Sequence, residues 1–233
     1  MATATPRSAR RAAGRPPVPR DLVLHVALAE ITPPIWRRLR VPDRLTLDQL
    51  HRVLQLVFGW MDYHLYEFRP GGDEDSADDG RRARLGALET PRLRWTIPDA
   101  EWDDPDFVET RDSRQTTLRE LALARGAALS YVYDFGDEWV HHILVEKVVK
   151  ARGAEDDSLP TLLDGARAGP PEDAGGVSGY ERLVEVLADP EDEEHEDVRR
   201  WAASFTGVPY DPERFERVAL NHALMLIGAW GSF

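Results

Sequence analysis

The feature that most constrains the fold is a β-hairpin pattern in the second half of the chain. Residues 128–134 and 139–149 are rich in aromatic and β-branched side chains, and the Phe-Gly-Asp-Glu sequence between them is typical of a turn. Alternate residues of a strand share a face, so Trp139 and His141 are expected on one face and His142 on the other. The two histidines are therefore not expected to face one site.

The remaining patterns place strands early in the chain and helices late. Further strands are expected at residues 21–31, 35–41, 62–69 and 92–97. Helices are expected at residues 46–58, where Thr46 and Gln49 form a capping box before the stop at Gly59, and at 118–126, 180–188, 193–204 and 212–230. Residues 98–115 and 150–178 lack periodicity and are expected to be loops. This order predicts an α+β fold, with a mixed or antiparallel sheet of hairpin-connected strands, helices packed on it and a mostly helical C-terminal part.

Charge divides the chain into two parts. Residues 1–20 hold five arginines and no acid, so the total net charge of −13 leaves −18 on residues 21–233. The first part is expected to be a basic, disordered tail. The second is expected to be a single domain, interrupted near residues 70–82 by an acidic, glycine-rich loop insertion.

Composition excludes several functions. The chain has no cysteine, which rules out disulfides, thiolate metal sites and cysteine nucleophiles. No apolar run approaches the roughly 20 residues of a membrane helix, and no secretory signal pattern is present, so no membrane association and a cytoplasmic location are expected. The acidic residues 21–233 are not expected to bind the phosphate backbone of nucleic acid, whereas the arginine-rich tail could contact it.

Four segments, taken in order, resemble one known family. They are IWRRLRVPDRLTLDQLHRVLQLVFGWMDYHLYEF, YDFGDEWVHHILVEKV, GPPEDAGGVSGYERL and DPEDEEHEDVRRW. Together they resemble the plasmid pRiA4b ORF-3-like family over about residues 21–222. The resemblance implies an α+β domain found mostly in bacteria and archaea, often on plasmids or near mobile elements, without an established biochemical activity.

The chain departs from the family pattern at three positions. Members commonly have cysteines around the PPED motif, where this chain has Gly169 and Ala174, and often have a second histidine where it has Tyr66. A metal or redox role that used those groups would here have to rely on carboxylates, histidines and aromatic residues.

Some family members carry a resolvase-like label, which these residues do not support. A serine recombinase needs a nucleophilic serine in an arginine-rich site. Ser8 lies in the tail, however, and Ser76 and Ser158 lie in acidic loops.

The hairpin turn is the first candidate site. If residues 135–138 form the turn, Asp134 pairs with Trp139 and shares a face with His141, which places a carboxylate near an imidazole as in a general base or metal site. The alternative is structural: Asp134 and Asp137 accept backbone N–H bonds in the turn, Trp139 fills the core and His141 bonds to a neighbour.

Two other segments carry candidate polar groups. In GWMDYHLYEF, Asp62 and His64 are expected to share a strand face, although an aromatic-rich strand equally suits core packing. In GPPEDAGG, the carboxylates of Glu172 and Asp173 could bind a divalent cation or an amine, or could cap the following helix.

Three functions remain open on these residues. The leading interpretation is a cytoplasmic accessory protein of plasmid or mobile-element type that acts as a non-enzymatic binding domain without a cofactor. Its ligand, an unknown protein or small molecule, is expected to occupy an aromatic cleft. The residues expected to line this cleft are Trp60, Tyr63, His64, Tyr133, Asp134, Asp137, Trp139, His141, Glu172 and Asp173. The alternative is a metal-dependent hydrolase with a divalent ion and ligands from His64, Asp134, Asp137, His141, Glu172 and Asp173. The third is a nucleic-acid-associated factor that binds through residues 1–20.

Overall fold

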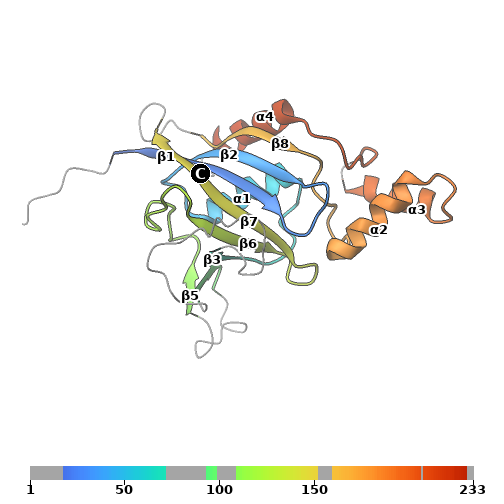
Figure 1. Ribbon diagram of the computed structural model, residues 1–233, viewed down its shortest axis with the longest axis horizontal. Coiled ribbons are helices and arrows are strands. Elements are labelled where there is room, and N and C mark those ends of the chain that lie inside the picture. The colour runs from blue at the N-terminus through green and yellow to red at the C-terminus, as the bar shows by residue number, and fades with distance from the viewer. Residues whose placement is uncertain (1–17, 72–92, 99–108, 152–158, 206, 230–233) are drawn as a thin grey trace, which may run out of the picture.

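The fold is built on one eight-stranded sheet (Figure 1). The computed structural model describes residues 18–71, 93–98, 109–151, 159–205 and 207–229. The strands lie in the order β5-β4-β3-β6-β7-β1-β2-β8, and every neighbouring pair is antiparallel except β4 and β5. Their bounds are β1 (Arg20–Leu28), β2 (Trp36–Pro42), β3 (Tyr66–Pro70), β4 (Leu93–Thr96), β5 (Glu109–Asp112), β6 (Ala128–Tyr133), β7 (Trp139–Lys150) and β8 (Thr161–Ala166).

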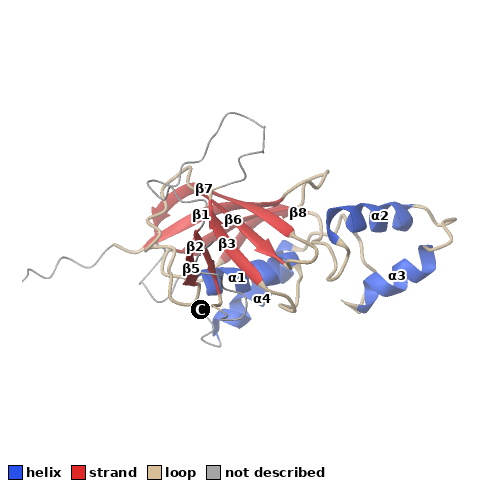
Figure 2. Cartoon of the chain, turned by 90° about the horizontal axis from the view of Figure 1, so that it is seen from below, coloured by secondary structure: helices blue, strands red, loops and turns tan. Residues whose placement is uncertain are grey.

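The helices fall into two groups. Helices α1 (Leu47–Phe58) and α4 (Arg217–Ala229) lie on one face of the sheet, as Figure 2 shows. Helices α2 (Gly176–Ala188) and α3 (His195–Ser204) pack on each other and extend from one end of the sheet in both views. The predicted α+β class, with a mixed sheet and a helical C-terminal part, is confirmed.

The core lies between α1 and the sheet face that carries Leu22, Leu24 and Val26 of β1. Helix α1 contributes an apolar stripe at helical spacing that includes Leu50 and Leu54, both fully buried. Each such side chain stabilises the fold by roughly 1.5–3 kcal/mol through burial. This packing fixes α1 against the strands that carry the candidate site.

Both ends of α1 are held by specific contacts. The predicted capping box is present, because Thr46 Oγ1 accepts from the Gln49 backbone and Gln49 Oε1 accepts from the Thr46 backbone. At the other end, Gly59 adopts φ 90° and stops the helix as predicted. The buried Arg37 donates from Nε to the Val57 carbonyl at 2.7 Å, so a positive charge faces the negative end of the helix dipole. The chain therefore leaves α1 in a fixed direction.

Several boundaries differ from the sequence predictions. The helix predicted at 118–126 is wrong: these residues form turns, and Ala122 leaves the helical region at φ 50°. Strands β5 and β8 lie in segments that were predicted to be loops. Helix α4 begins at Arg217 rather than at residue 212, because the Asp211 carboxylate accepts from the Glu213 backbone in a separate turn.

Two predictions fall largely outside the described residues. These are the basic tail at 1–20, of which only residues 18–20 are described, and the acidic insertion near 70–82. None of the helices in the described ranges has the length and apolar content needed to span a membrane.

Candidate functional site

The segment between α1 and β3 carries His64 and is tied to two other parts of the chain. The Trp60 indole N–H donates to the Pro170 carbonyl at 2.9 Å, and the Tyr63 backbone N–H donates to the Tyr133 hydroxyl at 3.1 Å. The predicted strand 62–69 is wrong at its start, because β3 begins only at Tyr66. His64 is therefore presented by a loop.

The expected pairing of Asp62 with His64 on one strand face is also wrong. Asp62 adopts φ 58°, and its Oδ1 lies 2.8 Å from Nε2 of His51 on α1. The hydrogen bond to His51 lowers the pKa of Asp62. The other ring nitrogen of His51 lies 2.8 Å from the Tyr131 hydroxyl. This buried histidine thus holds the loop against α1.

The β6–β7 turn is one residue longer than predicted. Tyr133, rather than Asp134, pairs with Trp139, and Asp134 adopts φ 57° as the first turn residue. Its Oδ1 accepts from the Gly136 backbone N–H at 2.8 Å. Because Asp134 has left the strand, its second carboxylate oxygen faces His64 and does not share a face with His141.

The PPED loop, residues 170–173 between β8 and α2, places two adjacent carboxylates in different environments. Glu172 is 2% exposed, and its Oε1 accepts from the Met61 backbone N–H at 2.6 Å and from the Tyr133 hydroxyl at 3.0 Å. Burial raises the pKa of Glu172, and burial together with the nearby Glu172 charge raises the pKa of Tyr133. Asp173, at φ 54°, has a side chain that is 63% exposed. The Glu172 carboxylate is therefore buried and hydrogen-bonded, whereas the Asp173 carboxylate is exposed to solvent.

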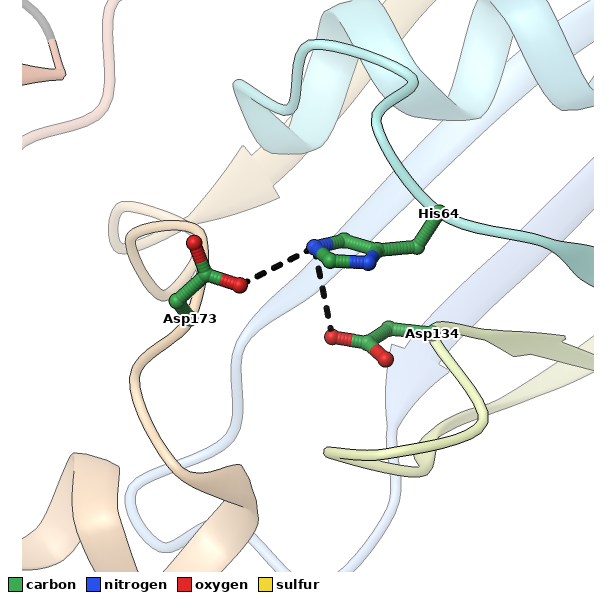
Figure 3. Close-up of side chains that lie close together, drawn as sticks. All are labelled: His64, Asp134 and Asp173. Carbon is green, nitrogen blue, oxygen red and sulfur yellow. Dashed lines mark hydrogen bonds and ion pairs between the residues drawn. The ribbon is translucent and has the colours of Figure 1, made fainter.

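These three segments meet at His64 (Figure 3). Its Nε2 lies 3.0 Å from Asp173 Oδ1 and 3.6 Å from Asp134 Oδ2. One ligand atom from each of the three residues lies within 4.8 Å of the other two. The buried Glu172 has its Oε2 4.0 Å from the same Nε2. We call His64, Asp134 and Asp173 the HDD cluster.

The HDD cluster has the composition of a divalent-metal site. One imidazole nitrogen and two carboxylate oxygens match the preferences of zinc, manganese and non-haem iron, which bind such atoms at roughly 2.0–2.2 Å. Three protein ligands leave coordination positions open, as in catalytic rather than structural metal sites. Among the described residues, no lysine or arginine forms an ion pair with the cluster. A bound cation would therefore balance the charge of the carboxylates.

Exposed apolar side chains accompany the cluster in sequence. Met61, Tyr63 and Leu65 flank His64, Phe135 follows Asp134, and all four are exposed large hydrophobic residues. Of these, only Tyr63 was predicted as a site residue. The signal that could have identified Met61 and Leu65 is the alternation of apolar residues with Asp62 and His64 after Gly59.

His141, predicted as a ligand, is not part of the site. It is fully buried, and its Nδ1 lies 3.0 Å from the Trp139 carbonyl and 3.3 Å from the Tyr131 carbonyl, while Nε2 has no hydrogen-bond partner among the described residues. Burial lowers the pKa of His141 to about 3. Its ring packs edge-on against Phe58 and Trp60, so it is a core residue.

The remaining predicted residues have structural contacts. Trp60, Tyr133 and Trp139 are buried and lie close to one another in the core, and the Tyr133 ring also packs edge-on against His64, with the ring centroids 5.9 Å apart. Asp137 accepts from the Gly175 backbone N–H at 2.9 Å, which caps the start of α2. Trp139 fills the core as the structural alternative expected, whereas Asp137 accepts a backbone N–H from α2 and not from the turn.

Two family positions noted in the sequence lie beside the site rather than in it. A Cβ atom at Gly169 would lie 2.0 Å from the Phe58 carbonyl oxygen, so the backbone here leaves no room for a side chain. The Tyr66 hydroxyl lies 2.9 Å from Ser113 Oγ and donates to Asp48, and its ring stacks on His51. Tyr66 therefore belongs to the core and not to the HDD cluster.

Fold and site together define an α+β sheet protein with a histidine–carboxylate cluster where two loops meet the β6–β7 turn. The chain belongs to the plasmid pRiA4b ORF-3-like protein family, whose sequence profile matches residues 20–219. It is 37% identical over 182 residues to the uncharacterized protein y4hQ of Sinorhizobium fredii, covering 78% of this chain and 80% of that protein. The crystal structure of MM3350, a protein of unknown function from Methanosarcina mazei Go1, superposes with a TM-score of 0.65 at 30% identity, covering 87% of this chain and 98% of that one.

Proposed function

We propose that this protein is a binding module that holds a divalent cation in the HDD cluster and uses the open coordination positions to bind its ligand. The observation that carries the proposal is the meeting of His64 Nε2, Asp134 Oδ2 and Asp173 Oδ1, whose mutual separations of up to 4.8 Å suit donors to one ion. Zinc and manganese are the ions that this donor set suits best.

The environment of the cluster supports this proposal. Glu172 and Asp134 are held by backbone N–H groups, so two of the nearby carboxylates are fixed before any ion binds. His64 and Asp173 remain partly exposed, which gives an ion access from solvent. A site with fixed ligands loses less conformational entropy on binding than one formed from mobile side chains.

The cellular setting is part of the proposal. The family description supports a plasmid-type accessory protein, and a chain without cysteine is compatible with the reducing cytoplasm. Contact with nucleic acid through residues 1–20 stays a prediction from their five arginines. It would appear as salt-sensitive binding that is lost when those residues are deleted.

Elemental mass spectrometry of the purified, untagged protein tests the metal. We expect near-stoichiometric zinc, manganese or iron in the wild type, and its loss in His64→Ala and Asp173→Asn. His222→Ala, which changes an exposed histidine on α4, is the matched control and should retain the metal. If the wild type contains no metal, and takes none up after incubation with zinc or manganese, the proposal fails.

Metal-dependent hydrolysis is the second candidate, and the position of Glu172 favours it. This carboxylate is buried, fixed by two donors and 4.0 Å from His64 Nε2, so it is placed to accept a proton from a water molecule at the cluster. Turnover of ester or phosphodiester substrates that is lost in Glu172→Gln, with metal content retained, would support hydrolysis. Absence of turnover by the metal-loaded wild type would exclude hydrolysis of these substrates and leave ligand binding as the proposed function.

A further inference from the structure

A cavity beside the β6–β7 turn is separate from the HDD cluster. It has a volume of about 300 Å³, and the residues that line it include the acidic Glu30, Asp137 and Glu138, the basic Arg69, and the apolar Val140 and Val177. Neither Glu172 nor any residue of the HDD cluster lines it. The volume is at the lower limit of small-molecule sites in proteins.

The cavity has an excess of negative charge. Three carboxylates against one guanidinium give the lining a net charge of −2. Arg69 is already paired with the buried Glu67, and Asp137 is bonded to the Gly175 backbone at the start of α2. The carboxylates of Glu30 and Glu138 have no hydrogen bond or ion pair among the described residues, so both are free to bind a ligand.

The two free carboxylates lie on backbone that is held in place. Glu30 and Glu138 adopt φ 61° and 54°, a region that non-glycine residues rarely occupy. The Glu138 N–H donates to the Asp134 carbonyl at 2.7 Å, and the Ala29 N–H donates to the Val140 carbonyl at 2.9 Å. These bonds join the β1–β2 connection to β7, so the walls that carry the two glutamates are fixed relative to each other.

We propose that this cavity binds an alkylammonium or alkylguanidinium group. The methylene stem would lie along Val140 and Val177, and the cationic head would be held between Glu30 and Glu138 in charge-assisted hydrogen bonds. A lysine or arginine side chain of a peptide and a free diamine share this chemistry. An anionic ligand is disfavoured, because the one cation of the lining is engaged by Glu67. The inference does not depend on a metal at the HDD cluster.

A chemical-shift titration of the ¹⁵N-labelled full chain tests this proposal. The probes are 1,5-diaminopentane for a free diamine and N-acetyl-lysine-N-methylamide for a peptide side chain, with glutarate as the anionic control. We expect saturable shifts at the cavity residues with at least one cationic probe below about 10 mM, and none with glutarate. The cationic probe that binds more tightly identifies the source of the ligand.

Variants with conservative changes complete the test. Because each variant removes one exposed ion pair with the ligand, Glu30→Gln and Glu138→Gln should each weaken binding roughly two- to fivefold. Glu185→Gln, on the exposed side of α2, is the matched control and should leave binding unchanged. No saturable binding by either cationic probe, equal binding of glutarate, or unchanged affinity in the Glu30→Gln and Glu138→Gln double variant would overturn the proposal.

Discussion

Nε2 of His64 lies 3.0 Å from Oδ1 of Asp173, although 109 residues separate them in the sequence. The contact joins the loop after α1 to the loop before α2, and Asp134 adds the β6–β7 turn to the same point. A partly exposed pair of this kind contributes little to stability by itself. We therefore attribute its significance to the ligand geometry that it creates.

Zinc should stabilise the wild type and not His64→Ala. A cation that binds only the folded state adds about 2.7 kcal/mol at a free concentration of 100 times its Kd. In a chain of this length that corresponds to an increase in Tm of about 5–10 °C. Thermal unfolding with zinc and with a chelator measures the difference, and His222→Ala should behave as the wild type. A similar increase in Tm for His64→Ala would place the ion elsewhere.

Removing the Tyr133 hydroxyl should destabilise the protein much more than removing the Tyr63 hydroxyl. The Tyr133 hydroxyl donates to Glu172 and accepts from the Tyr63 backbone, so Tyr133→Phe leaves buried groups unpaired and should cost about 1–3 kcal/mol. Tyr63→Phe changes an exposed side chain and should cost less than about 0.5 kcal/mol. Urea unfolding of both variants gives the comparison, and equal costs would show that the Glu172 contacts do not hold the PPED loop.

The sequence predicted the fold better than the site because the two depend on different information. Periodicity identified α1 with both of its caps and the long hairpin, since local patterns determine these elements. It missed β8, whose place beside β2 depends on long-range pairing. The predicted register of the hairpin was wrong by one residue. The prediction therefore placed Asp134 on the same face as His141, whereas its carboxylate faces His64.

The contact between His64 and the PPED loop could not be predicted from spacing. It depends on the turn after Gly59, where Asp62 takes a left-handed conformation and bonds to His51. Nothing in the local sequence specifies that a loop 109 residues away will meet this turn. Glu172 and Asp173 were identified as candidates from their loop composition, but their different burial follows only from the tertiary packing.

His141 should make the protein less stable as the pH falls. Its pKa in the folded state is about 3, below the ordinary value of 6.5, so the unfolded chain takes up a proton first. The contribution of His141 to stability is therefore lost between about pH 6.5 and pH 3, at up to about 1.4 kcal/mol per pH unit. An NMR titration of the ring should show His141 still neutral at pH 5. Protonation of His141 near pH 6.5 in the folded protein would contradict this account.

Gly169→Ala should be strongly destabilising because the new Cβ would lie 2.0 Å from the Phe58 carbonyl oxygen. Relief of that clash requires the PPED loop to move from α1, at a cost of about 2–4 kcal/mol. Gly126→Ala is the comparison, since a Cβ there meets no atom within 4 Å and only the left-handed φ of 86° is unfavourable, at about 1–2 kcal/mol. Chemical denaturation should rank the two variants in that order, and a smaller cost for Gly169→Ala would show that the loop is not packed as described.

Anomalous diffraction from crystals grown with zinc, recorded above and below the zinc edge, tests the central claim most directly. We predict one strong peak about 2.0–2.2 Å from His64 Nε2, Asp134 Oδ2 and Asp173 Oδ1, and no peak at that place in Asp173→Asn crystals. An electron-density map of zinc-soaked wild-type crystals that shows these three side chains in contact with one another, with no anomalous peak between them, would contradict a metal-binding function.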